Sequence, residues 1–122
     1  MAKNMEIAFL LDFYGDVLTE KQRNMVDYYY NDDLSLAEIA ENEGITRQGV
    51  RDSIKRAEAQ LWELEERLGL SRRFRQMLAD AQEIRHLAEE IGAFSTFPGA
   101  PREIGENTAR IIELADGLQS DS

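Results

Sequence analysis

Four cations and one amide side chain are grouped in a short segment of this 122-residue chain: Arg47, Gln48, Arg51, Lys55 and Arg56. Three of the cations are spaced by four residues, so on a helix they would share one face, with the amide beside them. Guanidinium groups can bind guanine edges and an amide can bind adenine in the major groove of DNA. The segment 45–57 contains these four cations and one carboxylate, so its local charge is +3. The pattern favours nucleic-acid recognition.

A second group of arginines follows in a window, residues 67–79, that contains no acid: Arg67, Arg72, Arg73 and Arg75. Three of them fall in the first turn of a helix predicted to begin at Ser71, where the helix dipole disfavours cations. One interpretation is a contact with an anion, an RNA phosphate or an acidic protein. The other, which we favour, is neutralisation by the acids just before the bend: Glu63, Glu65 and Glu66.

Composition excludes most catalytic and metal chemistry. The chain has no Cys and a single His, which removes thiolate zinc sites, cysteine nucleophiles and paired imidazole ligands. We therefore expect no enzyme activity, no cofactor and no metal, and we expect His86 to face solvent. The start has no secretory signal and no apolar run is long enough for a membrane span, which predicts a cytoplasmic protein. The net charge of −10 argues against a general nucleic-acid coat protein.

The elements that would position the first basic group fit a helix-turn-helix over residues 36–55. Ala40 is small enough for a close helix crossing, and Gly44 suits a turn with positive φ. Val50 and Ile54 are the inward positions of the second helix. In known helix-turn-helix proteins this second helix lies in the major groove.

Helix start and stop signals predict an all-α fold of about six helices. An opening helix has an apolar stripe from Ile7 to Leu18, widened by Phe9 and Phe13. The later helices are predicted from capping residues and breakers: 19–30 from the capping box Thr19/Gln22, 35–44 from Ser35/Glu38, 46–69 with Thr46 as N-cap, 71–91 with Ser71 as N-cap, and 102–116 after a loop at 92–101.

Apolar residues continue at alternating steps of three and four through the three C-terminal helices. The long helix carries a seam from Ile54 to Leu68. Beside this seam, Trp62 is expected to pack between helices, with the alternative that it anchors a partner. Two readings stay open, an intrachain bundle and a homodimer, and we favour the dimer. We predict a helix-turn-helix domain over residues 1–70 and a C-terminal helical extension over 71–122, joined as one continuous structural unit.

Several segments together resemble a known family: Leu10-Leu-Asp-Phe-Tyr14, Leu18-Thr-Glu-Lys-Gln-Arg23, Tyr28-Tyr-Tyr, Ser35-Leu-Ala-Glu-Ile-Ala40, Gly44-Ile-Thr-Arg-Gln48 and Ile54-Lys-Arg-Ala57. They look like region 4 of bacterial sigma factors. They more closely resemble the YlxM family of small bacterial helix-turn-helix proteins associated with the signal recognition particle. The resemblance implies a regulatory protein with a sigma region-4-like fold, whose gene commonly lies beside those of the particle's GTPase and its receptor.

Two departures weaken the expected DNA contact. The recognition helix has Gly49 and Asp52 where related helices usually carry polar or basic side chains. Three or four cations imply a salt slope of only about −3, so a monomer would bind DNA weakly and a dimer could recover affinity. We expect a DNA-binding regulator in which Arg47, Gln48, Arg51 and Lys55 face the major groove. The alternative is a module that binds the signal recognition particle GTPase or RNA without sequence-specific DNA binding.

Overall fold

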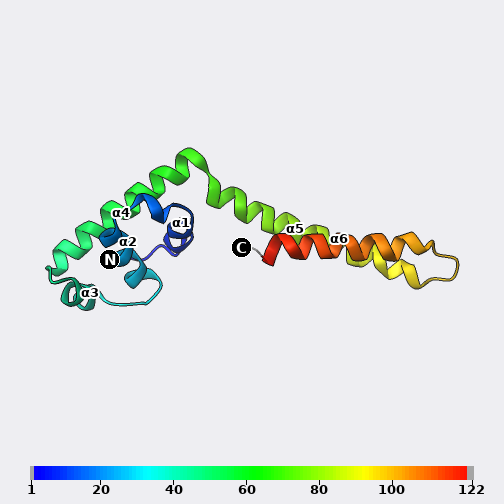
Figure 1. Ribbon diagram of the computed structural model, residues 1–122, viewed down its shortest axis with the longest axis horizontal. Helices are drawn as coiled ribbons and strands as arrows, with labels where there is room; N and C mark the ends of the chain where they lie inside the picture. Colours follow the sequence, from blue (N-terminus) through cyan, green and yellow to red (C-terminus); the bar gives the residue numbers. More distant parts are fainter. Residues whose placement is uncertain (1, 121–122) are drawn as a thin grey trace. The chain divides into compact units, whose positions relative to one another are not determined.

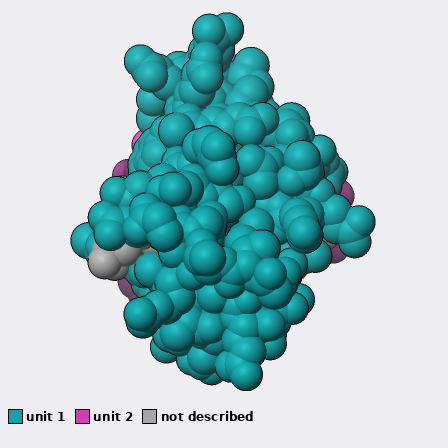
Figure 2. Space-filling model, turned by 90° about the vertical axis from the view of Figure 1, so that its left-hand side faces the viewer, with its two compact units in different colours: residues 1–72 teal, residues 73–122 magenta. Residues whose placement is uncertain are grey.

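The chain is all-helical in residues 2–120, the part that this computed structural model describes (Figure 1). These residues form six α-helices and two short 3-10 helices, without a strand. The predicted fold class is therefore confirmed. The chain divides into two compact units, Met1–Arg72 and Arg73–Ser122, which are coloured separately in Figure 2. We call them unit 1 and unit 2.

Unit 1 contains four helices and a 3-10 helix, followed by the start of a fifth helix: α1 (Glu6–Tyr14), η1 (Gly15–Val17), α2 (Glu20–Tyr30), α3 (Leu36–Glu43), α4 (Arg47–Leu68) and α5 (Leu70–Gly92). The backbone amides of Gln22 and Glu38 each donate to their N-cap hydroxyl at 3.1 Å, which confirms both predicted capping boxes. The amide of Gly49 donates to Thr46 Oγ1 at 3.0 Å and fixes the start of α4.

The core of unit 1 lies around α4, on which α1, α2 and α3 all pack. Large aliphatic side chains from each of these helices are fully buried: Ile7, Leu10, Val26, Ile39, Val50, Ile54 and Leu61. A hydrogen bond also links α2 to α4 at the edge of this core. The hydroxyl of Tyr30 donates to Glu58 Oε1 at 2.6 Å, and burial, followed by this bond, raises the pKa of Tyr30. The orientation of α4 is therefore set by packing along most of its length.

In unit 1, four apolar residues that the sequence places on or beside packed stripes are exposed instead: Phe9, Val17, Trp62 and Leu68. The opening helix ends at Tyr14 and continues as η1, whose tighter winding turns Val17 away from the stripe. Trp62 follows the buried Leu61 by one residue, which rotates it by about 100° from the inward face of the helix. Trp62 is 37 % exposed, so the expectation that it packs between helices is wrong in this chain.

Helix α5 begins without the predicted Ser71 cap. Ser71 is fully buried and its hydroxyl has no hydrogen-bond partner. The cap is the carboxylate of Glu65, which accepts the backbone amides of Ser71 and Arg72 at 3.0 Å. The Tyr14 hydroxyl donates to the same carboxylate at 2.7 Å and accepts the amide of Leu70 at 3.0 Å. A side chain from one helix therefore satisfies the first orphan donors of the next.

Burial and hydrogen bonding act in opposite directions on the pKa of Glu65. Burial alone would raise the pKa of this carboxyl, because it disfavours the charged form. The bonds from Tyr14 and from the two backbone amides, together with the charge of Arg72, outweigh burial and hold the pKa of Glu65 below its ordinary value. The carboxylate is therefore charged near neutral pH although its residue is only 5 % exposed.

Unit 2 is an antiparallel helical hairpin made of the rest of α5, the 3-10 helix η2 (Ala93–Thr96) and α6 (Arg102–Ser120) (Figure 1). The predicted loop at 92–101 thus contains a helical turn, and the last helix runs four residues beyond the predicted end at Asp116. Gly117 does not stop α6, because a glycine weakens a helix without breaking it. Arg85 Nε donates to Asp116 Oδ1 at 2.7 Å and ties the two helices together.

The contact between α5 and α6 is lined by small side chains: Ala81, Ala88, Thr108 and Ala115. A Cβ atom on Gly92 would lie 3.0 Å from Thr108 Oγ1, which shows how closely the two helices approach at the tip. Larger side chains on the predicted seams, among them Ile84, Ile91 and Leu118, are about half exposed. The predicted periodicity is present, but only its small members are fully covered, with Phe74 and Ile104 half-buried.

Candidate nucleic-acid interface

Helices α3 and α4 form the predicted helix-turn-helix. Gly44 ends α3 in the left-handed region with φ = 69°, and nothing lies within 4 Å of a Cβ built there, so its role is conformational. The next amide, that of Ile45, donates to Ala40 O at 3.1 Å and closes the turn. Ala40 is buried between the helices. The turn therefore fixes the direction of α4 relative to α3.

The first three turns of α4 separate an inward and an outward face. Val50 and Ile54 are fully buried, which sets the rotation of the helix about its axis. The five predicted contact residues are all exposed in the structure: Arg47, Gln48, Arg51, Lys55 and Arg56. Rotation set by the core thus leaves each of these side chains accessible to a ligand.

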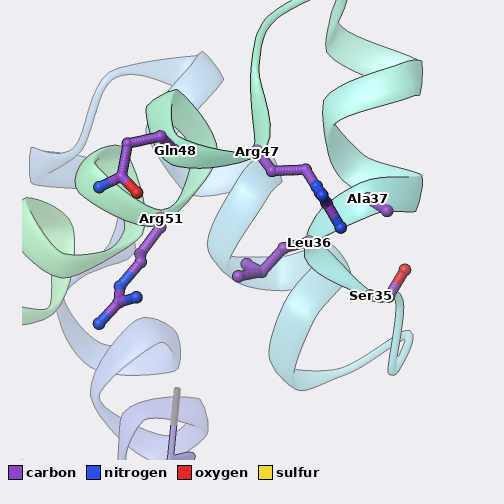
Figure 3. Close-up of a pocket in the computed structure, with 6 residues that line it drawn as sticks. All are labelled: Ser35, Leu36, Ala37, Arg47, Gln48 and Arg51. Carbon is purple, nitrogen blue, oxygen red and sulfur yellow. The ribbon is translucent and has the colours of Figure 1, made fainter.

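Three of the five line one open groove of about 680 Å³, together with the start of α3 (Figure 3). In that view Arg47 extends toward the first turn of α3, whereas Arg51 extends away from it, with Leu36 between them. Gln48 completes the wall on α4. Two guanidinium groups and an amide therefore line a single concave surface, and these are the groups that contact base edges and phosphates.

Lys55 and Arg56 are not among the residues that line this groove, and lie one turn further along α4. The carboxylate of Asp52 accepts a hydrogen bond from Gln48 Nε2 at 2.9 Å. This hydrogen bond partly satisfies the Asp52 carboxylate within the helix. The same bond occupies the Gln48 amide group that would otherwise bind a base.

The other wall of the groove consists of residues that sequence reasoning did not assign to the site: Ser35, Leu36 and Ala37. The Ser35/Glu38 capping box marks them, because a helix start carries free backbone amides and a partial positive charge. Combined with the helix-turn-helix pattern, that signal could have indicated this wall. The wall on α4 supplies the positive charge of the groove, whereas the exposed Glu38 carboxylate lies in the helix turn that forms the other wall.

The second arginine group is divided between the two units. Arg67 and Arg72 belong to unit 1, and Arg73 and Arg75 to unit 2. Arg67 forms an ion pair with Glu63 at 3.1 Å, and the Arg72 charge acts on Glu65. These partners agree with the neutralisation interpretation for the first two arginines.

No three His, Asp or Glu side chains are grouped as metal ligands among residues 2–120. His86 is exposed, as predicted, and pairs with Glu90 at 3.1 Å. In the same residues, none of the helices has the length and apolar character needed to cross a membrane.

Comparison with known proteins gives the same helix-turn-helix description. The family described as "Putative helix-turn-helix protein, YlxM / p13 like" matches residues 1–92, from the start of the chain through α5. A UPF0122 protein of Clostridium kluyveri is 53 % identical over 121 residues, covering 99 % of this chain and 85 % of the relative.

Two further relatives carry the same name. A UPF0122 protein of Acetivibrio thermocellus is 52 % identical over 84 residues, covering 69 % of this chain and 72 % of the relative. One of Geobacillus kaustophilus is 39 % identical over 107 residues, covering 87 % and 97 %. The family is one of helix-turn-helix proteins and not an enzyme family. This chain belongs to the UPF0122, YlxM/p13-like helix-turn-helix family.

Proposed function

We propose that this protein is a DNA-binding regulator that inserts the start of α4 into the major groove and binds as a dimer. The observation that carries the proposal is the shared groove of Arg47, Gln48 and Arg51 beside the N-terminus of α3. In this arrangement the three side chains contact base edges, Lys55 lies further along the same face, and Arg56 contacts a phosphate. The membership in a helix-turn-helix family supports the same function.

The charge distribution sets the strength of this binding. Unit 1 offers a small basic surface in a chain of net charge −10, so each protomer neutralises only three or four phosphates. The logarithm of the binding constant should then fall with the logarithm of salt concentration with a slope of about −3 per protomer. Two recognition helices in a dimer would double that number and restore affinity.

A gel-shift experiment at low salt tests the proposal, using duplexes from upstream of the protein's own operon. The double variant Arg47→Ala/Arg51→Ala should abolish the shift, since it removes both guanidinium groups that line the groove. The matched control is Arg102→Ala/Arg110→Ala, which removes two exposed arginines from α6 and changes the net charge equally. The proposal fails if the parent chain shifts no duplex at low salt, or if both double variants lose binding alike.

A second candidate function is a protein-interaction module for the signal recognition particle, which would bind its GTPase or its RNA. The observation in its favour is the acidic surface beside the groove: Asp32, Asp33, Glu38 and Glu41 are all exposed. Such a surface would attract a basic protein domain. Retention of the particle's GTPase or its RNA at low salt, with release at moderate salt, would support it. Retention of neither would reject this second function.

A further inference from the structure

Both helices of unit 2 carry a strict seven-residue repeat in which large and small side chains alternate. On α5 the large positions are Met77, Ile84 and Ile91, and the small ones are Ala81 and Ala88. On α6 the large positions are Ile104, Ile111 and Leu118, and the small ones are Thr108 and Ala115. Steps of four and three residues along each row are the signature of helices that pack as a bundle.

The hairpin covers the small positions and leaves the large ones accessible, except for Ile104, which is half-buried. The four small residues are at most 6 % exposed, because they lie where α5 and α6 meet. The large residues Met77, Ile84, Ile91, Ile111 and Leu118 are 39–56 % exposed. A bundle with only two helices thus buries half of each repeat.

The two large rows lie on the same side of the hairpin. On α5 the row is offset from the α6-facing residues by roughly a quarter turn, and on α6 the offset from the α5-facing residues has the same size and sense. Because the helices are antiparallel, equal offsets in the same sense place both rows on one face. The opposite face carries charged and polar groups, including the ion pair between Arg85 and Asp116.

We propose that this apolar face is covered by the same face of a second copy, so that two hairpins form a four-helix bundle. The occupant must offer exposed apolar side chains over rows of the same length. A second copy related by a two-fold axis meets this requirement, because its own two large rows have the same length and can pack against these rows at the centre of a four-helix bundle. This deepens the dimer in the proposed function, and its test uses no DNA.

The available area agrees with a stable dimer. Seven large apolar residues of α5 and α6 are exposed on or beside the two rows: Met77, Ile84, Leu87, Ile91, Ile111, Leu114 and Leu118. Taking roughly 200 Å² for a fully exposed large apolar residue, these half-exposed side chains present about 700 Å². A stable protein interface buries about 800 Å² on each partner. Two polar residues, Asp80 and Asn107, fall toward the outer borders of the two rows by the same helical spacing.

Sedimentation equilibrium of the full chain tests the proposal. The parent chain should sediment at twice its 14.0 kDa at micromolar concentration. The variant Ile84→Ala/Ile111→Ala truncates two large positions while keeping good helix formers, and should raise the dimer dissociation constant at least about 30-fold. The control Glu83→Ala/Glu113→Ala makes two truncations at exposed acids of the same helices and should leave the constant unchanged.

A charged pair of substitutions gives a second measurement. Ile84→Glu/Ile111→Glu should sediment as a monomer, with circular dichroism recording whether the hairpin keeps its helicity. A parent chain that stays monomeric overturns the proposal. A dimer whose dissociation constant is unmoved by both the alanine and glutamate pairs also overturns it, because the face would then be free or covered by something else. Gel-shift results do not enter either judgement, so the DNA-binding proposal can fail separately.

Discussion

Unit 1 buries large aliphatic and aromatic side chains between its helices, whereas the helix contact of unit 2 buries mainly alanine and threonine. Fully burying a large apolar side chain contributes about 1.5–3 kcal/mol, and an alanine much less. Unit 1 therefore has the core of an independent domain. Unit 2 has an amphipathic face whose largest side chains remain in contact with water.

Spectroscopy can follow the two units separately, which makes the comparison testable. The single Trp, Trp62, and all four tyrosines, Tyr14, Tyr28, Tyr29 and Tyr30, lie in unit 1. Intrinsic fluorescence thus reports on unit 1, whereas far-ultraviolet circular dichroism reports on the helices of both units. Comparing the two signals therefore separates a change in unit 1 from a change in unit 2.

The largest expected effect comes from truncating the core of unit 1. Ile54→Ala should lower the free energy of unfolding by about 3 kcal/mol, because it leaves a cavity at a fully buried position. Urea unfolding followed by fluorescence measures this. The counterpart in unit 2, Ile84→Ala, should leave the fluorescence transition unchanged. An equal loss of fluorescence-detected stability in both variants would break the distinction between the units.

The next effect comes from the carboxylate that caps α5. Glu65→Ala should destabilise unit 1 by about 2 kcal/mol, since it leaves the Tyr14 hydroxyl and two backbone amides without their acceptor. The exposed neighbour supplies the control, because Glu66→Ala removes the same charge and should change little. Similar urea midpoints for the two variants would show that the cap contributes no stability.

The same carboxylate predicts how the stability of unit 1 depends on acidity. The pKa of Glu65 is lower in the folded chain than its ordinary value of 4.5, so its contribution is present above pH 4.5 and is lost as the pH falls through the lower folded value. Fluorescence-detected stability of the parent should therefore drop below pH 4.5 more steeply than that of Glu65→Gln. Parallel pH profiles would contradict the hydrogen-bonded, charged state of this group.

The smallest effects come from two glycines and should have opposite signs. Gly44→Ala should cost about 1 kcal/mol in unit 1, because alanine is strained at φ = 69°. Gly117→Ala in α6 should stabilise the helices by about 0.5 kcal/mol, since no atom lies within 4 Å of the added Cβ. The first change should appear in fluorescence and the second in circular dichroism only. Two losses would show that Gly117 has a packing role.

Local chemistry made most helix boundaries predictable. Thr19, Ser35 and Thr46 are caps whose hydroxyls bind the amide three residues later, and that spacing is visible in the sequence. Gly44 was predictable for the same local reason. These signals also located α3 and α4, and with them the basic residues of the groove.

Long-range contacts were the part that the sequence could not reveal. Ser71 has the residue type of a cap, but a carboxylate six residues earlier takes that role once α4 and α5 are folded. Periodicity showed that Ile84 and Ile91 lie on an apolar row, yet it carries no information about what covers the row.

The Glu65 cap also determines where this chain can be divided. Gly69, between α4 and α5, looks like the natural end of a first domain. A fragment ending there would keep the buried carboxylate and remove the amides of Ser71 and Arg72 that it accepts. Such a fragment would hold a charge in its interior with the Tyr14 hydroxyl as its remaining neutral donor. A fragment that includes the first turn of α5 preserves all three bonds. The C-terminal boundary of unit 1 therefore lies within α5 and not in the turn before it.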